Sequence, residues 1–477
     1  MSDQRNINRR NFMGLAGSAA FGMLGANLAN SSQKKQKLNI VFLLVDDLGW
    51  TDLGCYGSQY YETPNIDRLA SQGMRFTNAY AACTVCSPTR ASIISGKYPA
   101  RVRITDWIAG HNRPYAKLRV PEFNYQLPLE EITIAEVMKQ AGYTSASMGK
   151  WHLGGDPFYP DKQGFDVNVG GDHRGQPPSY FSPHRIPILK DGPKGEYMPD
   201  RLAREAVKFI DKNQDQPFLL YLPFYEVHTP LQAKKELIEY YQKKEKPGKQ
   251  KNAKYAAMIH STDEAIGKIM AKLDDLGISD NTLVILTGDN GGLINVTNNE
   301  PLRAGKGSAY EGGVREPLIV RWPGVVKPGS ECHEPVISVD YYPTMLQAAD
   351  APADPKQKLD GESIVPLLRD PDARLKRDEI FWHYPHYHPG GAKPYGAVRQ
   401  RDYKLLEFYE DGKLELYNLK EDIGESKDLS KEMPDKTAEL HNLLKTWRLD
   451  CDAQMPHPNI DYDPERANNR AGQKKKK

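Results

Sequence analysis

Four oxygen-bearing side chains follow two apolar runs and could together bind a hard metal ion. Asp46 and Asp47 end the run LNIVFLLV, and Asp289 and Asn290 follow TLVILT. Adjacent carboxylates at a buried strand end repel each other and lose hydration, so they need a cation or a basic partner. Three carboxylates and one amide suit Ca²⁺ or Mg²⁺ rather than zinc. Each pair alone could instead be structural, with Asp47 capping a helix and residues 288–292 forming a turn.

Five basic side chains follow predicted strand ends or lie in Gly-rich loops: Arg90, Lys150, His152, His228 and Lys306. Basic side chains and a divalent metal ion repel each other unless an anion lies between them. The two histidines add proton-transfer capacity near neutral pH. Any one of the five could be a surface charge or a packed histidine. The prediction of an anion site depends on the whole set.

The segment CTVCSPTRASIISG contains two cysteines, Cys83 and Cys86, spaced like a redox or zinc pair. Zinc would need a second pair of ligands, and a redox pair would need a thioredoxin-like unit. The sequence has neither, although a plain packed cysteine stays possible. Pro88 favours a helix that begins near Cys86, where free N–H groups attract an anion that Arg90 also faces. A thiolate is a poor ligand for a hard cation, so an oxygen nucleophile would suit this position better.

The elements that position these residues alternate between strands and helices. Four apolar runs, 38–45, 143–148, 218–225 and 282–287, are typical of strands buried on both faces. Helical patterns lie between them, for example 63–74, 133–143 and 256–277. This alternation predicts a doubly wound, mostly parallel α/β sheet flanked by helices. Ligands bind at the carboxyl ends of such strands, where all four runs lead into polar clusters.

The pattern of residue types along the chain changes after about residue 375. Short aromatic segments separated by turns predict a small antiparallel sheet, followed by a helix through TAELHNLLKTWRLD. We therefore predict a catalytic domain at 38–375, a C-terminal subdomain at 376–465 and a disordered basic tail at 466–477.

Composition and the N-terminus indicate an exported protein. The net charge of +2 over 477 residues gives no sign of nucleic-acid binding. Arg9 and Arg10 precede a mildly apolar Gly/Ala-rich stretch, which predicts a twin-arginine export signal over residues 1–30 and a periplasmic or secreted protein. No later segment is apolar enough to span a membrane. The five cysteines are an odd number, so at least one is unpaired or modified, and the pairing of Cys55, Cys83, Cys332 and Cys451 stays open.

The chain resembles the type I sulfatases of the alkaline-phosphatase-like superfamily. Their signature is Cys-x-Pro-Ser/Thr-Arg, which reads here from Cys86 to Arg90 and closes with Ser95-Gly96 in place of the usual Thr-Gly. Further landmarks follow in the family's order: VDDLGWTDLGCYG, TPNIDRLASQG, GKWHLG, VHTP, TGDNGG, GKGSAYEGGVREP and VDYYPT. The resemblance covers roughly residues 38–428.

The resemblance implies that a separate maturation enzyme oxidises Cys86 to formylglycine. It further implies one Ca²⁺, with Mg²⁺ less favoured, bound by the residue-86 hydrate and by Asp46, Asp47, Asp289 and Asn290. Arg90, Lys150, His152, His228 and Lys306 would position residue 86 and the sulfate. One hydroxyl of the hydrate would attack sulfur, while His228, or alternatively Lys306, protonates the leaving alcohol. His152 would help to deprotonate the second hydroxyl, which expels sulfate.

Three stretches outside this core could select the substrate: 107–117, 170–185 and 381–391. Their His, Arg, Tyr and Trp residues suit a sulfated carbohydrate, with His173, Arg174, His383 and His386 as the specificity candidates. These residues could instead pack the two domains together. The alternative functions are a phosphate or phosphonate monoester hydrolase of the same superfamily and a non-catalytic sulfated-glycan binder. The Cys86 motif and the single metal set argue against the first, and the complete catalytic set argues against the second.

Overall fold

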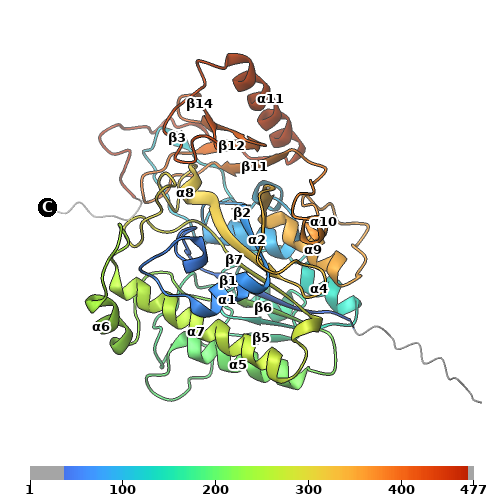
Figure 1. Cartoon of the computed structure of the whole chain (residues 1–477). Coiled ribbons are helices and arrows are strands. Elements are labelled where there is room, and N and C mark those ends of the chain that lie inside the picture. The colour runs from blue at the N-terminus through green and yellow to red at the C-terminus, as the bar shows by residue number, and fades with distance from the viewer. Residues whose placement is uncertain (1–36, 471–477) are drawn as a thin grey trace, which may run out of the picture. The chain divides into compact units, whose positions relative to one another are not determined.

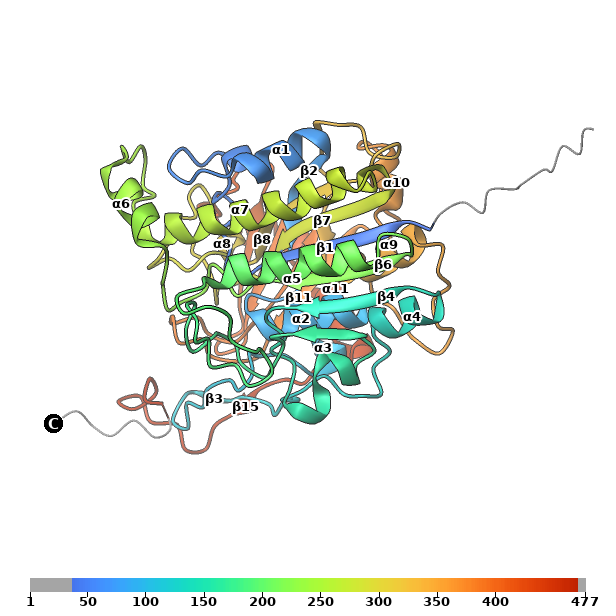
Figure 2. The same ribbon diagram turned by 90° about the horizontal axis from the view of Figure 1, so that it is seen from below.

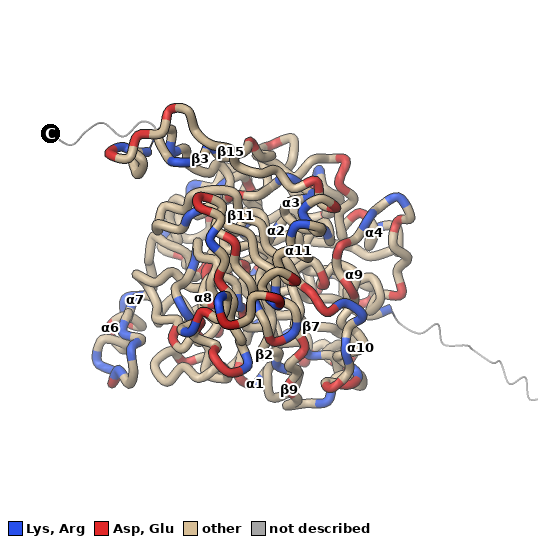
Figure 3. Tube along the Cα trace, turned by 90° about the horizontal axis from the view of Figure 1, so that it is seen from above, with Lys and Arg blue, Asp and Glu red and all other residues tan. Residues whose placement is uncertain are grey.

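The structure, a computed structural model, describes residues 37–470. The predicted export signal at 1–30 lies outside the described residues, and of the predicted basic tail at 466–477 only residues 466–470 are described. Within 37–470, no helix combines the length and apolarity that a membrane crossing requires. Lys and Arg are interspersed with Asp and Glu over this part of the chain (Figure 3).

The four apolar runs form neighbouring parallel strands at the centre of a nine-stranded sheet. β1 (Asn39–Val45) lies between β7 (Thr282–Gly288) and β6 (Phe218–Pro223), and β4 (Thr144–Met148) pairs with β6. The order is β10-β2-β8-β7-β1-β6-β4-β5, with β9 paired to β2. The outer strands are β2 (Met74–Tyr80), β5 (Val167–Val169), β8 (Arg315–Arg321), β9 (Ser330–Cys332) and β10 (Val336–Ile337). β8 is antiparallel to its neighbours β2 and β7, whereas the other strands of this sheet pair in parallel. The sheet is therefore mostly parallel, as predicted.

Helices cover both faces of this sheet because its central strands are apolar on both sides (Figures 1 and 2). Val41 and Leu43 of β1 pack in one core, and Ile40, Phe42 and Leu44 pack in the other. The first core includes residues of α1 (Pro64–Gln72), α5 (Met198–Lys212), α6 (Lys235–Lys243) and α7 (Ala253–Asp275). The second includes residues of α2 (Cys86–Ser95), α3 (Pro99–Val102), α4 (Ile134–Gln140), α9 (Tyr341–Ala348) and α10 (Val365–Arg369).

The C-terminal segments form the small antiparallel sheet that the sequence predicts. β11 (Glu379–Tyr384), β12 (Tyr395–Gln400), β13 (Tyr403–Phe408) and β14 (Lys413–Asn418) pair in chain order. α11 (Pro434–Asp450) packs on one face of this sheet, and the other face packs against residues 80–85 and the short α8 (Glu311–Val314) (Figure 1). The chain then returns to the large domain, where β15 (His457–Pro458) pairs with β3 (Leu118–Arg119). No pattern in the sequence predicts this last pairing.

Candidate active site

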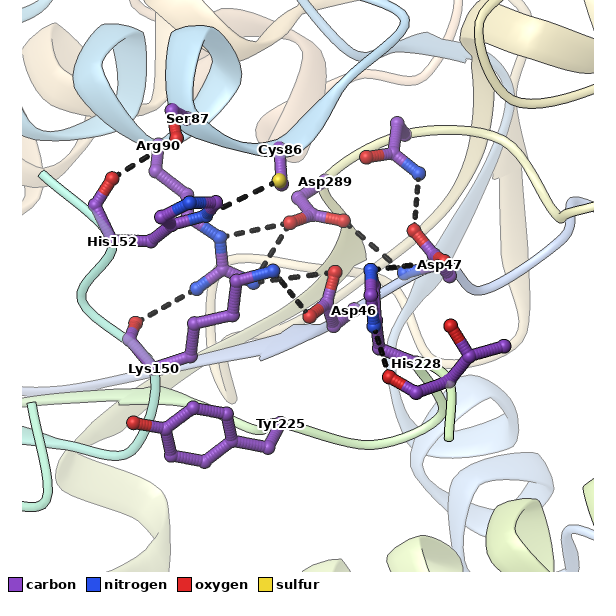
Figure 4. Close-up of polar contacts among 12 residues, drawn as sticks. Asp46, Asp47, Cys86, Ser87, Arg90, Lys150, His152, Tyr225, His228 and Asp289 are labelled. Atoms are coloured by element: carbon purple, nitrogen blue, oxygen red, sulfur yellow. Dashed lines mark hydrogen bonds and ion pairs between the residues drawn. The ribbon is translucent and has the colours of Figure 1, made fainter. Parts of the chain in front are cut away.

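The carboxyl ends of β1 and β7 bring the four predicted metal ligands together, and Figure 4 labels three of them, Asp46, Asp47 and Asp289. In the paired register Val45 lies opposite Gly288, so the residues that follow each strand meet at one edge of the sheet. The backbone N–H of Asp47 donates to Oδ1 of Asp289 at 3.2 Å, and Nδ2 of Asn290 donates to Oδ1 of Asp47 at 2.8 Å. Asp46, Asp47, Asp289 and Asn290 are all buried.

This cluster has the properties of a site for an oxygen-preferring cation. Oδ1 of Asp46 and Oδ1 of Asn290 are buried and have no hydrogen-bond partner among the described residues, 37–470. Ligand atoms of Asp46, Asp47 and His228 lie within 4.8 Å of one another. Burial raises the pKa of Asp46 well above its usual range, and the Asp289 carboxylate raises it further. Crowded oxygen donors with unused lone pairs fit a cation such as Ca²⁺, because buried polar atoms otherwise find partners.

Three basic side chains contact the same carboxylates. Arg90 Nε donates to Oδ2 of Asp289 at 2.8 Å, and Lys150 Nζ donates to Oδ2 of Asp46 at 2.6 Å. Lys306 forms an ion pair with Asp47. Burial disfavours the Lys306 cation, but Asp47, Cys86 and Asp46 together outweigh burial and raise the pKa of Lys306 above its ordinary value. Lys306 therefore stays positively charged at neutral pH.

The local backbone explains how Lys150 reaches the cluster. Gly149 directly follows β4 and has φ +118°, and a Cβ atom there would lie 2.0 Å from the carbonyl oxygen of Pro223. Only glycine fits this approach. The turn lets the Lys150 N–H donate to Pro223 at 2.8 Å, which directs the Lys150 side chain toward Asp46.

Cys86 is the first residue of α2 and faces the cluster, as the sequence predicts. Its Sγ lies 3.3 Å from Nδ1 of His152, whose Nε2 bonds to the carbonyl oxygen of Ile108. Ser87 fixes this arrangement, because its Oγ accepts from the Ile108 N–H at 3.1 Å and donates to the His152 carbonyl at 3.0 Å. His152 and Asp47 both have φ 59°, in the left-handed region that non-glycine residues rarely adopt outside functional sites.

His228 lies on the other side of Asp47. Its Nε2 is 3.7 Å from Oδ2 of Asp47, and its Nδ1 donates to the Thr229 carbonyl at 2.6 Å. Burial lowers the pKa of His228 to about 3, despite the opposing charge of Asp47. In the neutral ring, Nε2 is therefore a hydrogen-bond acceptor.

A cavity of about 470 Å³ opens over Cys86. Its lining comes from the predicted site and from loops of both domains: Asp47, Cys86, Trp107, Ile108, His152, Gly175, Gln176, His228, Thr229, Leu293, Lys306, His388 and Pro389. Two lining residues, His388 and Pro389, belong to the C-terminal part of the chain. The cavity has room for a sulfate group and part of the molecule that carries it.

The four predicted specificity residues do not line this cavity. His383 is buried between Tyr409 and the Gln454 carbonyl, and His386 is buried against Thr105. His173 is exposed, and Arg174 pairs with Asp172.

Other residues from the same three stretches reach the cavity instead: Trp107, Ile108, Gly175, Gln176, His388 and Pro389. The composition of the sequence predicts the three stretches that contribute to the cavity. It does not predict which residues line the cavity, because strand alternation turns His383 inward and the turn after β11 sets the direction of His388.

Cys83, the other cysteine of the CxxC pair, is a packed core residue. Cys83 is buried in the core between the two sheets, where burial raises the pKa of its thiol. All five cysteines are present as free thiols. The structure therefore separates a packed Cys83 from a Cys86 that faces the cavity.

Fold and site together are those of an alkaline-phosphatase-like hydrolase. The family model described as Sulfatase matches residues 38–351, and a second, described as N-sulphoglucosamine sulphohydrolase, C-terminal, matches residues 305–450. The chain belongs to the sulfatase family and is a sulfuric ester hydrolase.

Relatives resemble the chain over most of its length. A protein named Sulfatase from Formosa agariphila is 34% identical, with 90% of this chain and 92% of the relative covered. Arylsulfatase A of Homo sapiens is 33% identical, with 86% and 87% covered. The crystal structure of Ps i-CgsB has a TM-score of 0.75 and 31% identity over 91% of this chain and 97% of that one. The same protein has been solved in complex with k-i-k-neocarrahexaose.

Proposed function

We propose that this protein hydrolyses sulfate monoesters of a carbohydrate with a formylglycine made from Cys86 and one bound Ca²⁺. The observation that carries the proposal is the position of Cys86 at the N-terminus of α2, on the floor of the cavity and beside buried oxygens that lack partners. A thiol has no role next to such a cation, whereas an oxygen nucleophile does.

Asp46, Asp47, Asp289 and Asn290 would hold the Ca²⁺, which supplies positive charge for a sulfuryl oxygen when it is bound. A hydrated formylglycine supplies an attacking oxygen and a second hydroxyl through which the sulfate can leave. Arg90 and Lys150 hold two of the carboxyl groups in place, through hydrogen bonds of 2.8 Å to Asp289 and 2.6 Å to Asp46. Lys306 faces the cavity with a positive charge and stabilises the charge that builds on the sulfate oxygens.

His152 is placed to act as a base toward residue 86. A carbonyl oxygen accepts a hydrogen bond, so Nε2 of His152 carries the proton that it donates to Ile108. Nδ1 then presents a lone pair toward residue 86. Burial lowers the pKa of His152 well below its usual range, and Lys150 adds to this effect, so the ring is neutral at pH 7. His152 can therefore take a proton from a hydroxyl at this position.

The leaving alcohol faces either His228 or Lys306. His228 already donates from Nδ1 to Thr229, so it can protonate the alcohol only as an imidazolium that carries a second proton on Nε2. Lys306 keeps protons available while it pairs with Asp47. Both side chains line the cavity, and both remain candidates for the general acid.

A carbohydrate fits the outer part of the cavity. Trp107 offers an aromatic surface for a sugar ring, and Gln176 and His388 offer polar groups for hydroxyls. The complex of Ps i-CgsB with k-i-k-neocarrahexaose supports this substrate class. We also propose that the protein is exported through the twin-arginine signal at residues 1–30.

The test is a sulfate-release screen over defined oligosaccharides, using protein co-expressed with a formylglycine-generating enzyme. Mass spectrometry of the Cys86 peptide establishes the extent of conversion. We expect sulfate release in proportion to the converted fraction, and none from matched phosphate esters. Full activity in protein that retains the Cys86 thiol would contradict the proposal, and a preference for phosphate or phosphonate esters would favour the alternative hydrolase.

A further inference from the structure

A second cavity borders the active-site cavity across one short segment of the chain. His388 and Pro389 line the active-site cavity, whereas Tyr387 and Gly391 line a second cavity of about 340 Å³. Residues 387–391 therefore contact both spaces. Arg113, from the loop after α3, lines the second cavity and donates from Nη2 to the His388 carbonyl oxygen at 2.7 Å.

Within residues 37–470, Arg113 forms no ion pair with a carboxylate, and Glu410 on the same cavity acts on it only at longer range. Its other hydrogen bond goes to Oδ1 of Asn468 at 3.3 Å, and its guanidinium lies 5.5 Å from the centre of the Tyr387 ring. Both acceptors are neutral, and within residues 37–470 no carboxylate oxygen lies within 4 Å of this guanidinium. Its Nε is buried without a partner. A half-buried arginine in this state is suited to an anionic ligand.

The other charges around this cavity leave it positive. Glu410 is already engaged, because it pairs with Lys393 and accepts from the Tyr387 hydroxyl at 2.8 Å. Lys117 and Asp411 are both exposed and offset each other. Arg470 is close enough to lower the pKa of Arg113, in addition to the larger effect of burial. The uncompensated charge is therefore that of Arg113.

We propose that Arg113 binds a second anionic substituent, a sulfate ester or a carboxylate, on the same carbohydrate chain that presents its scissile sulfate at Cys86. This inference rests on the proposed function. A guanidinium can bind the two oxygens of such a group with parallel hydrogen bonds. Tyr462 lines the same cavity, is partly exposed, and provides a ring face for the sugar that carries the anion. The preferred substrate is then a polyanionic oligosaccharide rather than a monosulfated sugar.

The test measures how oligosaccharides inhibit the hydrolysis of 4-nitrophenyl sulfate. The probes are k-i-k-neocarrahexaose, a singly sulfated form of the same hexasaccharide, and chondroitin hexasaccharides with and without sulfate, which compare sulfate with carboxylate. We expect wild-type protein to bind the polyanionic member of at least one series more tightly. Arg113→Gln should reduce that preference about tenfold, the size of one charge-assisted hydrogen bond, and Arg113→Lys should retain part of it.

Arg68→Gln, an exposed arginine on α1, is the matched control and should leave the preference unchanged. Equal binding of polyanionic and singly sulfated probes by the wild type, or an unchanged preference in Arg113→Gln, would overturn the inference. A failure of the proposed function is a separate result. It would appear as hydrolysis of 4-nitrophenyl sulfate without sulfate release from any carbohydrate, and the binding preference would still be measurable.

Discussion

Nδ1 of His152 lies 3.3 Å from Sγ of Cys86, and Nε2 of the same ring is held by the carbonyl oxygen of Ile108. The ring is therefore fixed in one tautomer, with its lone pair directed at the residue that becomes the nucleophile. In the proposed function this lone pair accepts a proton after the alcohol has left, when sulfate is expelled.

His152→Ala should lower kcat for 4-nitrophenyl sulfate by about 100- to 10,000-fold, the usual contribution of a positioned base. Because the alcohol leaves before His152 acts, rapid mixing should show a burst of 4-nitrophenol followed by slow turnover. His333→Ala, in an exposed side chain, is the control. Loss of the burst together with the steady-state rate would mean that His152 acts in the first step instead.

Removal of the metal should destabilise the protein as well as inactivate it, because the carboxylates of Asp46, Asp47 and Asp289 would then repel one another. Calcium added to chelator-treated protein should raise the melting temperature, with about 2.7 kcal/mol of stabilisation at a hundredfold excess over Kd. Differential scanning calorimetry and calorimetric titration with CaCl₂ measure the two effects. Asp289→Asn should abolish both responses, whereas the exposed Asp274→Asn should keep them. Calcium binding to Asp289→Asn with unchanged affinity would place the ion elsewhere.

Asp106 should make the protein less stable as the pH rises. Burial raises the pKa of Asp106 to about 8, although the Tyr384 hydroxyl, at 2.8 Å, and the Trp107 N–H donate to the carboxyl group. The folded state therefore holds a proton that the unfolded state releases near pH 4, so this group costs stability between pH 4 and 8.

Asp106→Asn should remove this cost, since an amide oxygen can still accept both hydrogen bonds. The stability of the variant relative to wild type should increase by about 2–4 kcal/mol between pH 5 and pH 8, measured by urea unfolding. Asp280→Asn, at a position that is almost fully exposed, should show no such change. A pH-independent difference for Asp106→Asn would show that Asp106 is ionised throughout this range.

Lys404 should be essential for joining the small sheet to the large domain. Its Nζ lies 2.8 Å from Oε1 of Glu311 and 3.1 Å from Oε1 of Glu425, and all three side chains are completely buried. Lys404→Met would remove the cation that lies between two buried carboxyl groups, leaving Glu311 with Arg315 alone and Glu425 without an ion-pair partner within residues 37–470, which should cost about 3–5 kcal/mol in urea unfolding. The pair of Lys413 and Glu415 on β14, in which the lysine is exposed, provides the comparison, and Lys413→Met should cost less than about 1 kcal/mol because Glu415 keeps hydrogen bonds from the Tyr310 and Tyr417 hydroxyls. Equal effects of the two variants would contradict this account.

The central sheet could be predicted because its strands are apolar along their whole length. The runs that end at Val45, Met148 and Thr287 are buried on both faces, and the polar residues after them mark the carboxyl edge. β8 is harder to predict from the sequence, because it lies directly after the short α8 and carries charged residues at both ends. β3 and β15 contain two residues each, too few for any periodicity.

The sequence by itself determined the chemistry of this protein. Strand ends meet at one edge of any parallel sheet. The types and order of the residues near these ends therefore predict a site with oxygen ligands for a metal and basic groups for an anion: Asp46, Cys86, Arg90, Lys150 and Asp289. Only the tertiary structure decided which side chains border the cavity. His388 reaches it, while His383 and His386 turn into the interior, and Arg113 forms no ion pair with a carboxylate of residues 37–470. These outcomes depend on the packing of the small sheet against the loops of the large domain, and contacts between distant segments leave no local pattern in the sequence.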